Sequence, residues 1–182
     1  VHEFDLDRLE WEEMGPDVPP AAFTKENAVL DKDGKPLAGV KYEGKIYACS
    51  RHTYDGLAIV PDKCLMLCVQ GVSTAGYSNK LDPAVFKQFY TGRGLWTFDA
   101  VKREWAVSKT NGLAMYHGGS AVWPKEPDWV YMYSNHGEFT AVNWKTEEVR
   151  KLEAPPEGMT TSYVGLEYYP DEESLVAFPK GR

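Results

Sequence analysis

The chain is short of basic charge and of long apolar runs, and each shortage excludes a class of protein. Its 182 residues contain no stretch of about 18 apolar residues, so no membrane-spanning helix is expected. Lys and Arg number 20 against 27 Asp and Glu, a net charge of −7. Nucleic acid is therefore not expected as a partner, because binding phosphates requires a basic face.

Motifs that carry catalysis are also missing. The sequence has no G-x-S-x-G nucleophile elbow, no glycine-rich phosphate loop and no HExxH motif. Its four histidines, His2, His52, His117 and His136, show no paired spacing of metal ligands. We therefore expect no catalytic residues, no metal and no cofactor in this chain, and favour a protein that is not an enzyme.

Cysteine is scarce, with Cys49, Cys64 and Cys68 as the three examples. The segment from Cys64 to Cys68 is typical of a buried strand, in which the two Cα atoms lie about 13 Å apart, too far for a disulfide. Cys49 could pair with either of them across strands, but three buried free thiols are favoured.

Apolar and aromatic residues are plentiful, at 43% and 13% of the chain. This composition provides enough apolar surface for a folded core and argues against disorder. Asp82 to Tyr90 is the one segment that favours a helix, with Asp at the N-cap, Pro at the first position and helical apolar spacing.

One internal repeat resembles a hairpin of two short strands around a polar turn. Residues 3–11 and 97–105 align without gaps, and each places Asp six residues before Trp. Residues 142–149 are a third copy, with Asn in place of Asp and Val in place of Trp. Two short apolar segments around a polar turn indicate a β-hairpin.

A second repeat alternates with the first. Residues 54–62 and 163–171 share Tyr-x-Gly-Leu followed by Pro-Asp at identical spacing, and residues 116–124 are a third copy. An apolar strand follows each copy. Because Pro fixes φ and cannot donate to a ladder, the Pro pair marks the turn of a second kind of hairpin.

The alternation of the two hairpins predicts an all-β fold of four-stranded antiparallel units with strands A to D. The period is 44 residues from Asp99 to Asn143 and 47 from Tyr116 to Tyr163. About 45 residues per unit is the period of a β-propeller blade, and regular alternation of two motifs favours this fold over a β-sandwich with chance similarities. The expected parts of this single propeller segment are strands C and D at 1–15, full blades at 54–109 and 116–152, strands A and B at 161–178, and long insertions at 16–53 and 71–94.

These residues resemble a kelch repeat. The resemblance is carried by Arg51 to Leu57, the strand ending in Gln70-Gly71, Leu95 to Asp99, and Trp105. The chain departs from the family pattern where Gln70-Gly71 replaces a double glycine. The resemblance implies a kelch-like or galactose-oxidase-like propeller and implies no particular function, because propellers include both binding proteins and enzymes.

The number of blades points to a partner. The chain holds about three blades, whereas closed propellers have about four to eight. We therefore expect either the rest of a longer propeller chain or a homo-oligomeric partner.

The binding face is expected where the two long insertions emerge. Up-and-down topology places the D–A and B–C connections on one side, and insertions in repeat proteins gather on the binding face. Candidate ligand-binding residues there are Arg51, His52, Tyr77, Tyr90, Arg93, His117 and His136. Such side chains suit a glycan or an acidic peptide.

Several candidates have a structural alternative. Arg51 and His52 can tie neighbouring blades together, His136 fits a turn, and His117 fits packing as well as binding. Asp31 to Gly34 is similar to the opening of a calcium loop, but Tyr42 stands at the twelfth position where a glutamate is needed, so a β-turn is favoured.

We therefore expect a non-catalytic kelch-like propeller segment that recognises a protein or glycan through its long-loop face. The alternative is a fragment of a propeller enzyme, a secreted oxidase or carbohydrate-active enzyme, whose catalytic residues lie largely outside this chain.

Overall fold

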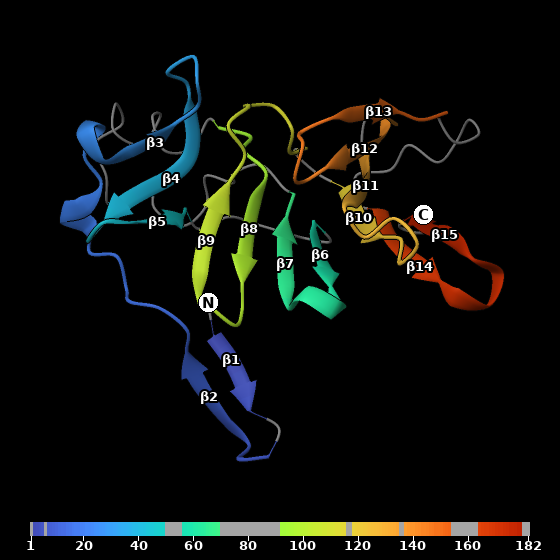
Figure 1. Ribbon diagram of the computed structural model, residues 1–182, viewed down its shortest axis with the longest axis horizontal. Helices are drawn as coiled ribbons and strands as arrows, with labels where there is room; N and C mark the ends of the chain where they lie inside the picture. Colours follow the sequence, from blue (N-terminus) through green and yellow to red (C-terminus); the bar gives the residue numbers. More distant parts are fainter. Residues whose placement is uncertain are drawn as a thin grey trace.

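The computed structural model describes residues 2–5, 7–49, 56–69, 92–115, 118–134, 137–153 and 164–179. This part of the chain is all-β, as predicted: it forms strands joined by turns and single-turn 3-10 helices (Figure 1). The helix expected over 82–90 lies outside the described residues.

The strands form five separate antiparallel sheets. Two have four strands, in the order β6-β7-β8-β9 and β10-β11-β12-β13. One has three, β3-β4-β5, and two have two, β1-β2 and β14-β15. The strand bounds are β1 His2–Asp5, β2 Glu10–Glu13, β3 Ala28–Leu30, β4 Pro36–Tyr42, β5 Lys45–Ala48, β6 Leu57–Val60, β7 Leu65–Cys68, β8 Trp96–Asp99, β9 Glu104–Val107, β10 Gly118–Val122, β11 Trp129–Ser134, β12 Phe139–Asn143, β13 Val149–Lys151, β14 Val164–Tyr169 and β15 Ser174–Pro179.

The first repeat forms the hairpins β1–β2, β8–β9 and β12–β13, and its turn explains the recurring Asp or Asn. Asp99 Oδ1 accepts a hydrogen bond of 2.9 Å from the Lys102 backbone N–H, and Asn143 Oδ1 accepts two of 3.0 Å in its own turn. The hydrogen bond from the Lys102 N–H is the largest of the causes that lower the pKa of Asp99, and the Lys102 side chain is the next. Aspartate and asparagine are the residues whose side chains close a turn in this way.

The second repeat forms the hairpins β6–β7, β10–β11 and β14–β15. Its Pro-Asp pair begins a 3-10 turn, η3 (Pro61–Lys63) in one hairpin and η4 (Pro170–Glu172) in another. A left-handed residue follows each turn, Cys64 at φ 47° and Glu173 at φ 48°. We had expected Cys64 to be the first residue of a buried strand. It is instead an exposed turn residue, because β7 begins one residue later. Cys49 and Cys68 are buried, and all three cysteines are free thiols.

Residues 16–53, expected as a long loop, contain the three-stranded sheet β3–β5 together with η1 (Pro20–Ala22) and η2 (Lys25–Asn27). The β-turn expected at Asp31 to Gly34 is present between β3 and β4. Asp31 Oδ1 accepts hydrogen bonds from the N–H groups of Asp33, at 2.9 Å, and Lys35, at 2.8 Å. Gly34 supplies the positive φ of 77° that this turn requires.

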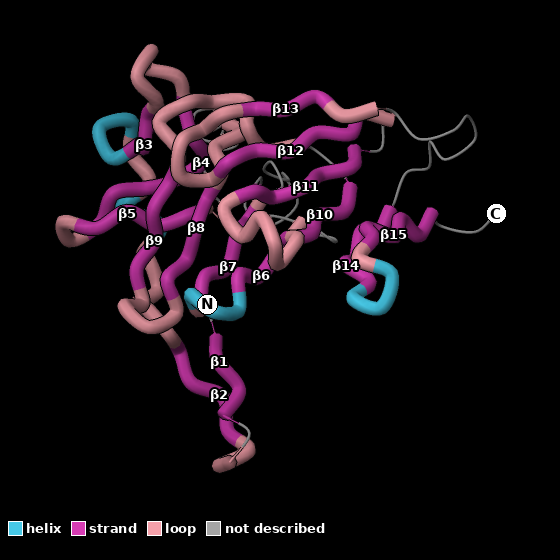
Figure 2. The backbone as a smooth tube through the Cα atoms, turned by 45° about the vertical axis from the view of Figure 1, so that its right-hand side comes forward, coloured by secondary structure: helices cyan, strands magenta, loops and turns pink. Residues whose placement is uncertain are grey.

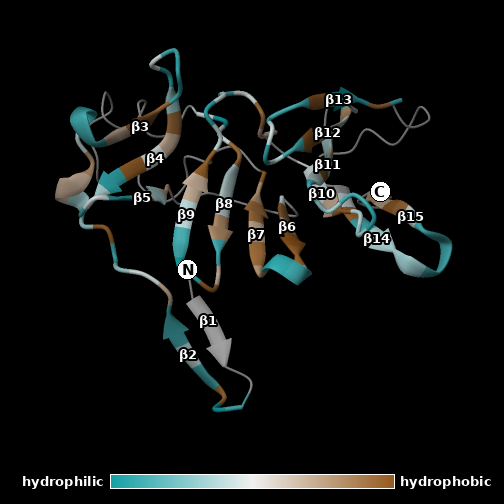
Figure 3. Cartoon of the chain, in the orientation of Figure 1, coloured by the Kyte–Doolittle hydropathy of each residue, from teal (hydrophilic) through white to brown (hydrophobic). Residues whose placement is uncertain are grey.

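The sheets pack face to face in the order of the sequence. One apolar cluster joins β6–β9 to β10–β13, and a second joins β10–β13 to β14–β15. A third packs β3–β5 on the other face of β6–β9. Figure 3 shows β6 and β7 mainly in the brown of apolar residues, and Figure 2 shows the two four-stranded sheets side by side. The first strands also neighbour one another, since β10 contacts both β6 and β14. The residues of the first cluster are Ala58, Val60, Leu65, Leu67, Val69, Leu95, Leu113, Met115, Val130, Met132 and Val142.

Ion pairs link the β6–β7, β10–β11 and β14–β15 turns, which belong to successive sheets. Lys63, in the turn after β6, lies 2.8 Å from Asp128, in the turn before β11. Lys125, in that same turn, pairs with Glu173 in the turn between β14 and β15. These pairs are solvent-exposed, so they add little to stability, but they join neighbouring turns in the same order as the apolar clusters do.

Trp96 fixes how closely β4 approaches the β6–β9 sheet. The Trp96 side chain is fully buried, and its indole N–H donates a hydrogen bond of 2.7 Å to the Leu37 carbonyl. Gly39 lies directly against the ring, because a Cβ at this position would stand 2.2 Å from two Trp96 ring carbons. A glycine is therefore required at position 39 for this sheet to pack.

We predict that Gly39→Ala lowers the free energy of unfolding by roughly 1–3 kcal/mol, because the added methyl group overpacks the contact with Trp96. Denaturant unfolding measures this loss. Gly15→Ala is the matched control: nothing lies within 4 Å of a Cβ at that position, so its effect stays within about 0.5 kcal/mol. Equal stability of the two variants would contradict the described packing.

Tyr131 forms a polar cluster beside the second four-stranded sheet. Its hydroxyl donates a hydrogen bond to the Glu126 carboxylate, and Arg150 Nη1 lies 3.1 Å from the same group. Burial, and next this hydrogen bond, raises the pKa of Tyr131 to about 12. The same two partners lower the pKa of Glu126, with the hydrogen bond from Tyr131 as the largest cause.

The raised pKa of Tyr131 predicts an alkaline loss of stability. Its contribution is fully present below the ordinary tyrosine pKa of 10.0 and is lost as the pH rises through about 12. Tyr131→Phe should lower the free energy of unfolding by about 1 kcal/mol at neutral pH and should make the loss of stability at alkaline pH smaller. Denaturant unfolding curves at neutral pH and at a pH of about 12 test this. An ultraviolet difference titration in which the Tyr131 hydroxyl ionises at its ordinary pKa would refute it.

Candidate functional site

The structure describes one of the seven residues expected on the long-loop face, Arg93. The others lie outside the described residues: Arg51, His52, Tyr77, Tyr90, His117 and His136. Their grouping on one face stays a prediction.

Arg93 lies where three connections meet. Its backbone N–H donates to Asn111 Oδ1 at 2.9 Å, and its carbonyl accepts hydrogen bonds from the N–H groups of Gly112 and Ala114. Asn111 Nδ2 in turn donates to the Pro36 carbonyl at 2.8 Å. The end of the B–C connection, the D–A connection before β10 and the start of β4 are therefore held together at this end of the β6–β9 sheet.

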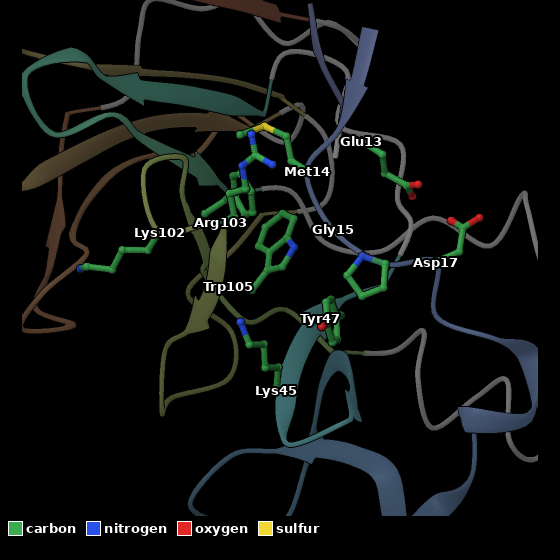
Figure 4. A pocket seen from close by; sticks show the side chains of 11 residues that line it. Glu13, Met14, Gly15, Asp17, Lys45, Tyr47, Lys102, Arg103 and Trp105 are labelled. Atoms are coloured by element: carbon green, nitrogen blue, oxygen red, sulfur yellow. The ribbon is translucent and has the colours of Figure 1, made fainter.

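A cavity of about 410 Å³ opens at the other end of the β6–β9 sheet, next to the turn between β8 and β9. Its walls come from three parts of the chain: the segment after β2, the strand β5, and the β8–β9 hairpin (Figure 4). A volume of this size is within the range of small-ligand sites. The cavity is lined by Glu13, Met14, Gly15, Pro16, Asp17, Lys45, Tyr47, Phe98, Lys102, Arg103 and Trp105.

Aromatic side chains form the apolar wall of this cavity. Trp105 is half-buried on β9, and its ring centroid lies 4.9 Å from that of Phe98, its cross-strand partner. Trp96 supports Trp105 from behind in an edge-on contact at 6.1 Å. Figure 4 shows the Trp105 indole at the centre, with Arg103 on one side and Tyr47 and Lys45 on the other. Because Trp96 is fully buried, the position of Trp105 is fixed by the core.

Charged side chains of both signs surround the aromatic wall. Arg103 Nη2 lies 3.5 Å from Glu12, Lys45 Nζ lies 3.4 Å from Glu104, and Lys102 Nζ lies 3.0 Å from Asp99. The cations are thus matched by carboxylates, and the rim has no large excess of positive charge. Exposed groups of this kind donate and accept hydrogen bonds readily because their ion pairs are weak.

A second hollow of about 250 Å³ continues the first along β5 and β9. The two share four lining residues, Lys45, Tyr47, Arg103 and Trp105. We call these four residues the Trp105 groove. The groove presents an aromatic face with hydrogen-bonding groups on both sides, an arrangement that fits a ligand with an apolar face and polar edges.

The Trp105 groove was not predicted from the sequence. The binding face was expected where the two long insertions emerge, and residues 16–53 were expected as a loop and not as the sheet that provides Lys45 and Tyr47. The recurrence of Trp in the first hairpin repeat was the available signal. The third copy replaces Trp by Val149, which shows that the hairpin forms without it.

The described residues were also compared with the requirements of a metal site and of a membrane-spanning helix. Among the residues that the structure describes, no three His, Cys, Asp or Glu side chains are grouped to hold a metal ion. Within the same residues, no helix has the length and apolarity to cross a bilayer.

Comparison with known proteins returned no match, either to a family model or to a curated protein.

We predict that Lys45→Ala and Arg103→Ala each change the free energy of unfolding by less than about 0.5 kcal/mol, because their ion pairs are exposed. Trp96→Ala, which empties a fully buried position behind the groove, should cost about 3–5 kcal/mol. Chemical denaturation of the three variants checks the contrast. A large loss with Lys45→Ala would mean that the groove is part of the structural core.

Proposed function

We propose that the chain is a non-catalytic, kelch-like propeller segment that binds a glycan in the Trp105 groove. The observation that carries the proposal is the cavity of about 410 Å³ whose wall is formed by Trp105 and Tyr47 and whose rim is charged.

The propeller interpretation is supported by how the sheets pack. Antiparallel sheets stack face to face in sequence order, and the first strand β10 contacts the first strands β6 and β14 of the sheets on either side. Radial repetition of four-stranded sheets around their first strands is the arrangement of a propeller. The two alternating hairpin repeats and the kelch-like residues Leu95 to Asp99 and Trp105 agree with it.

A glycan fits the chemistry of the groove better than an acidic peptide does. A sugar ring has an apolar face, which an indole or phenol ring can cover, and hydroxyl groups at its edges that donate and accept hydrogen bonds. The rim of the cavity has carboxylates and cations in nearly equal numbers, and these groups can hydrogen-bond to the hydroxyl groups of such a neutral ligand. An acidic peptide would need cations that are not already matched by Glu12, Asp99 and Glu104.

The long-loop face remains a second proposed contact surface, for a protein or a glycan. Arg93 sits at the meeting point of three connections, which suits a surface built on a rigid end of the sheet. A binding experiment that compares Arg93 with Trp105 separates the two locations.

The test is a glycan-array screen followed by titration calorimetry with the tightest binder. Trp105→Ala should weaken binding by about tenfold or more, since it removes the stacking surface, and Lys45→Gln or Arg103→Gln should weaken it several-fold. Trp11→Ala is the matched control: Trp11 holds the equivalent position of the β1–β2 hairpin and lines neither cavity.

Unchanged affinity of Trp105→Ala would refute the groove as the binding site. If Trp105→Ala bound with unchanged affinity and either Arg51→Ala or Arg93→Ala did not bind, the long-loop face would be the site instead. If no glycan bound, the proposed ligand class would be wrong.

A further inference from the structure

Two of the five sheets repeat the two halves of the complete sheet β6–β9. The hairpin β14–β15 has the register of β6–β7: Leu166 pairs with Ala177 and Tyr169 with Ser174, as Leu57 pairs with Cys68 and Val60 with Leu65. A Pro-Asp 3-10 turn and a left-handed residue close both hairpins. The β14–β15 sheet is therefore built like the first half of a four-stranded sheet.

The hairpin β1–β2 repeats the second half. Phe4 pairs with Trp11 and Asp5 with Glu10, as Phe98 pairs with Trp105 and Asp99 with Glu104. The turn residues Leu9 and Arg103 share a left-handed conformation, at φ 54° and 55°. In the complete sheet, this second half adds to the first by pairing β8 with β7.

Within the described part of the chain, the two halves are not paired with each other. Each forms a separate two-stranded sheet, and they lie apart in both views of the backbone (Figures 1 and 2). The outer edge of β15, which corresponds to the edge of β7 that binds β8, has no strand partner among the described residues. A free strand edge presents a row of backbone donors and acceptors and is a template for another strand.

Apolar side chains are also exposed on β6, at the edge of the face that β3–β5 covers in part, and on the β14–β15 hairpin. Leu57 and Ile59 are 40% and 54% exposed on the face of β6 that points away from β10–β13. On β14–β15, Leu166 packs against β10–β13, and the opposite face exposes Tyr169 at 45% and Phe178 at 56%. By the order of the stack, these two faces are the ones that a neighbouring sheet would cover.

We propose that a second copy of this chain joins the two ends. The β14–β15 hairpin of one copy pairs through β15 with β1 of the other, and its Tyr169 and Phe178 face covers Leu57 and Ile59 of that copy. The β7–β8 register places Leu175 opposite Phe4 and Val176 opposite Glu3. The exchange is reciprocal, so both free edges close in a dimer.

The number of sheets is consistent with a ring formed by two copies. One copy supplies the sheets β6–β9 and β10–β13 and the two halves of a third. Three sheets are fewer than the four or more blades of a closed propeller, whereas two copies supply six. The inference rests on strand register and exposed faces and does not depend on the proposed ligand.

The first experiment measures the mass of the intact chain by sedimentation equilibrium. We expect twice the chain mass of 20.5 kDa. Phe178→Asp and Ile59→Asp, at exposed positions, should each weaken the dimer by about tenfold or more while leaving the circular dichroism spectrum unchanged. Val101→Asp is the matched control, because Val101 is 77% exposed in the β8–β9 turn and lies on neither face.

The second experiment tests the register by disulfide cross-linking between two single-site variants, both with the exposed Cys64 replaced by serine. A Glu3→Cys chain mixed with a Val176→Cys chain should form a covalent dimer, because directly opposite residues are within disulfide distance. Glu3→Cys mixed with Glu167→Cys should not, because Glu167 lies one strand further away on the same hairpin.

A monomeric mass, a dimer unaffected by both aspartate substitutions, or equal cross-linking of the two mixtures would each overturn the proposal. Trp105→Ala should leave the mass unchanged, so a failure of the glycan proposal and a failure of the dimer proposal are distinguishable.

Discussion

The burial of the central strands β7 and β8 on both faces is the constraint on which the rest of the structure depends. Ala58, Val60 and Leu67 face the next sheet, and Cys68 and Trp96 face β3–β5. A sheet covered on both sides needs apolar residues at successive positions, and Leu65–Cys68 has them. Because β4 packs directly on this sheet, a glycine is required at position 39, where the backbone lies against the Trp96 ring.

The same constraint positions the candidate site. Trp105 belongs to the cluster that packs β3–β5 on β6–β9, and its ring is supported by Trp96 and Phe98. The cavity opens next to the β8–β9 turn, where this cluster ends, so one edge of the Trp105 ring lines the cavity. A ligand stacked there would meet a ring held in place by the core, which limits the entropy lost on binding.

The hairpins could be predicted from the sequence because their signals are local. Asp99 and Asn143 accept hydrogen bonds from their own turns, and Pro61 and Pro170 begin theirs, so each signal lies within a few residues of its effect. The error at Cys64 arose because a left-handed turn residue followed by an apolar strand cannot be distinguished from a longer strand by hydropathy alone.

The Trp105 groove could not be predicted, because it depends on contacts between distant residues. The strand β3 has three residues, and β4 begins with a proline and contains Gly39, so hydropathy alone does not indicate these strands, although β4 and β5 pair locally as a hairpin. No pattern within residues 16–53 indicates that Tyr47 lies beside Trp105. The candidate residues of the long-loop face, by contrast, were selected by topology, and Arg93 alone among them lies within the described residues.

The claim that successive sheets stack in sequence order is tested most directly by methyl nuclear Overhauser effects in solution. The account predicts cross-peaks between residues of the cluster that joins the two four-stranded sheets, with Val60, Leu65 and Leu67 on one side and Val130, Met132 and Val142 on the other. Cross-peaks confined within each sheet, with none between these two groups, would contradict it.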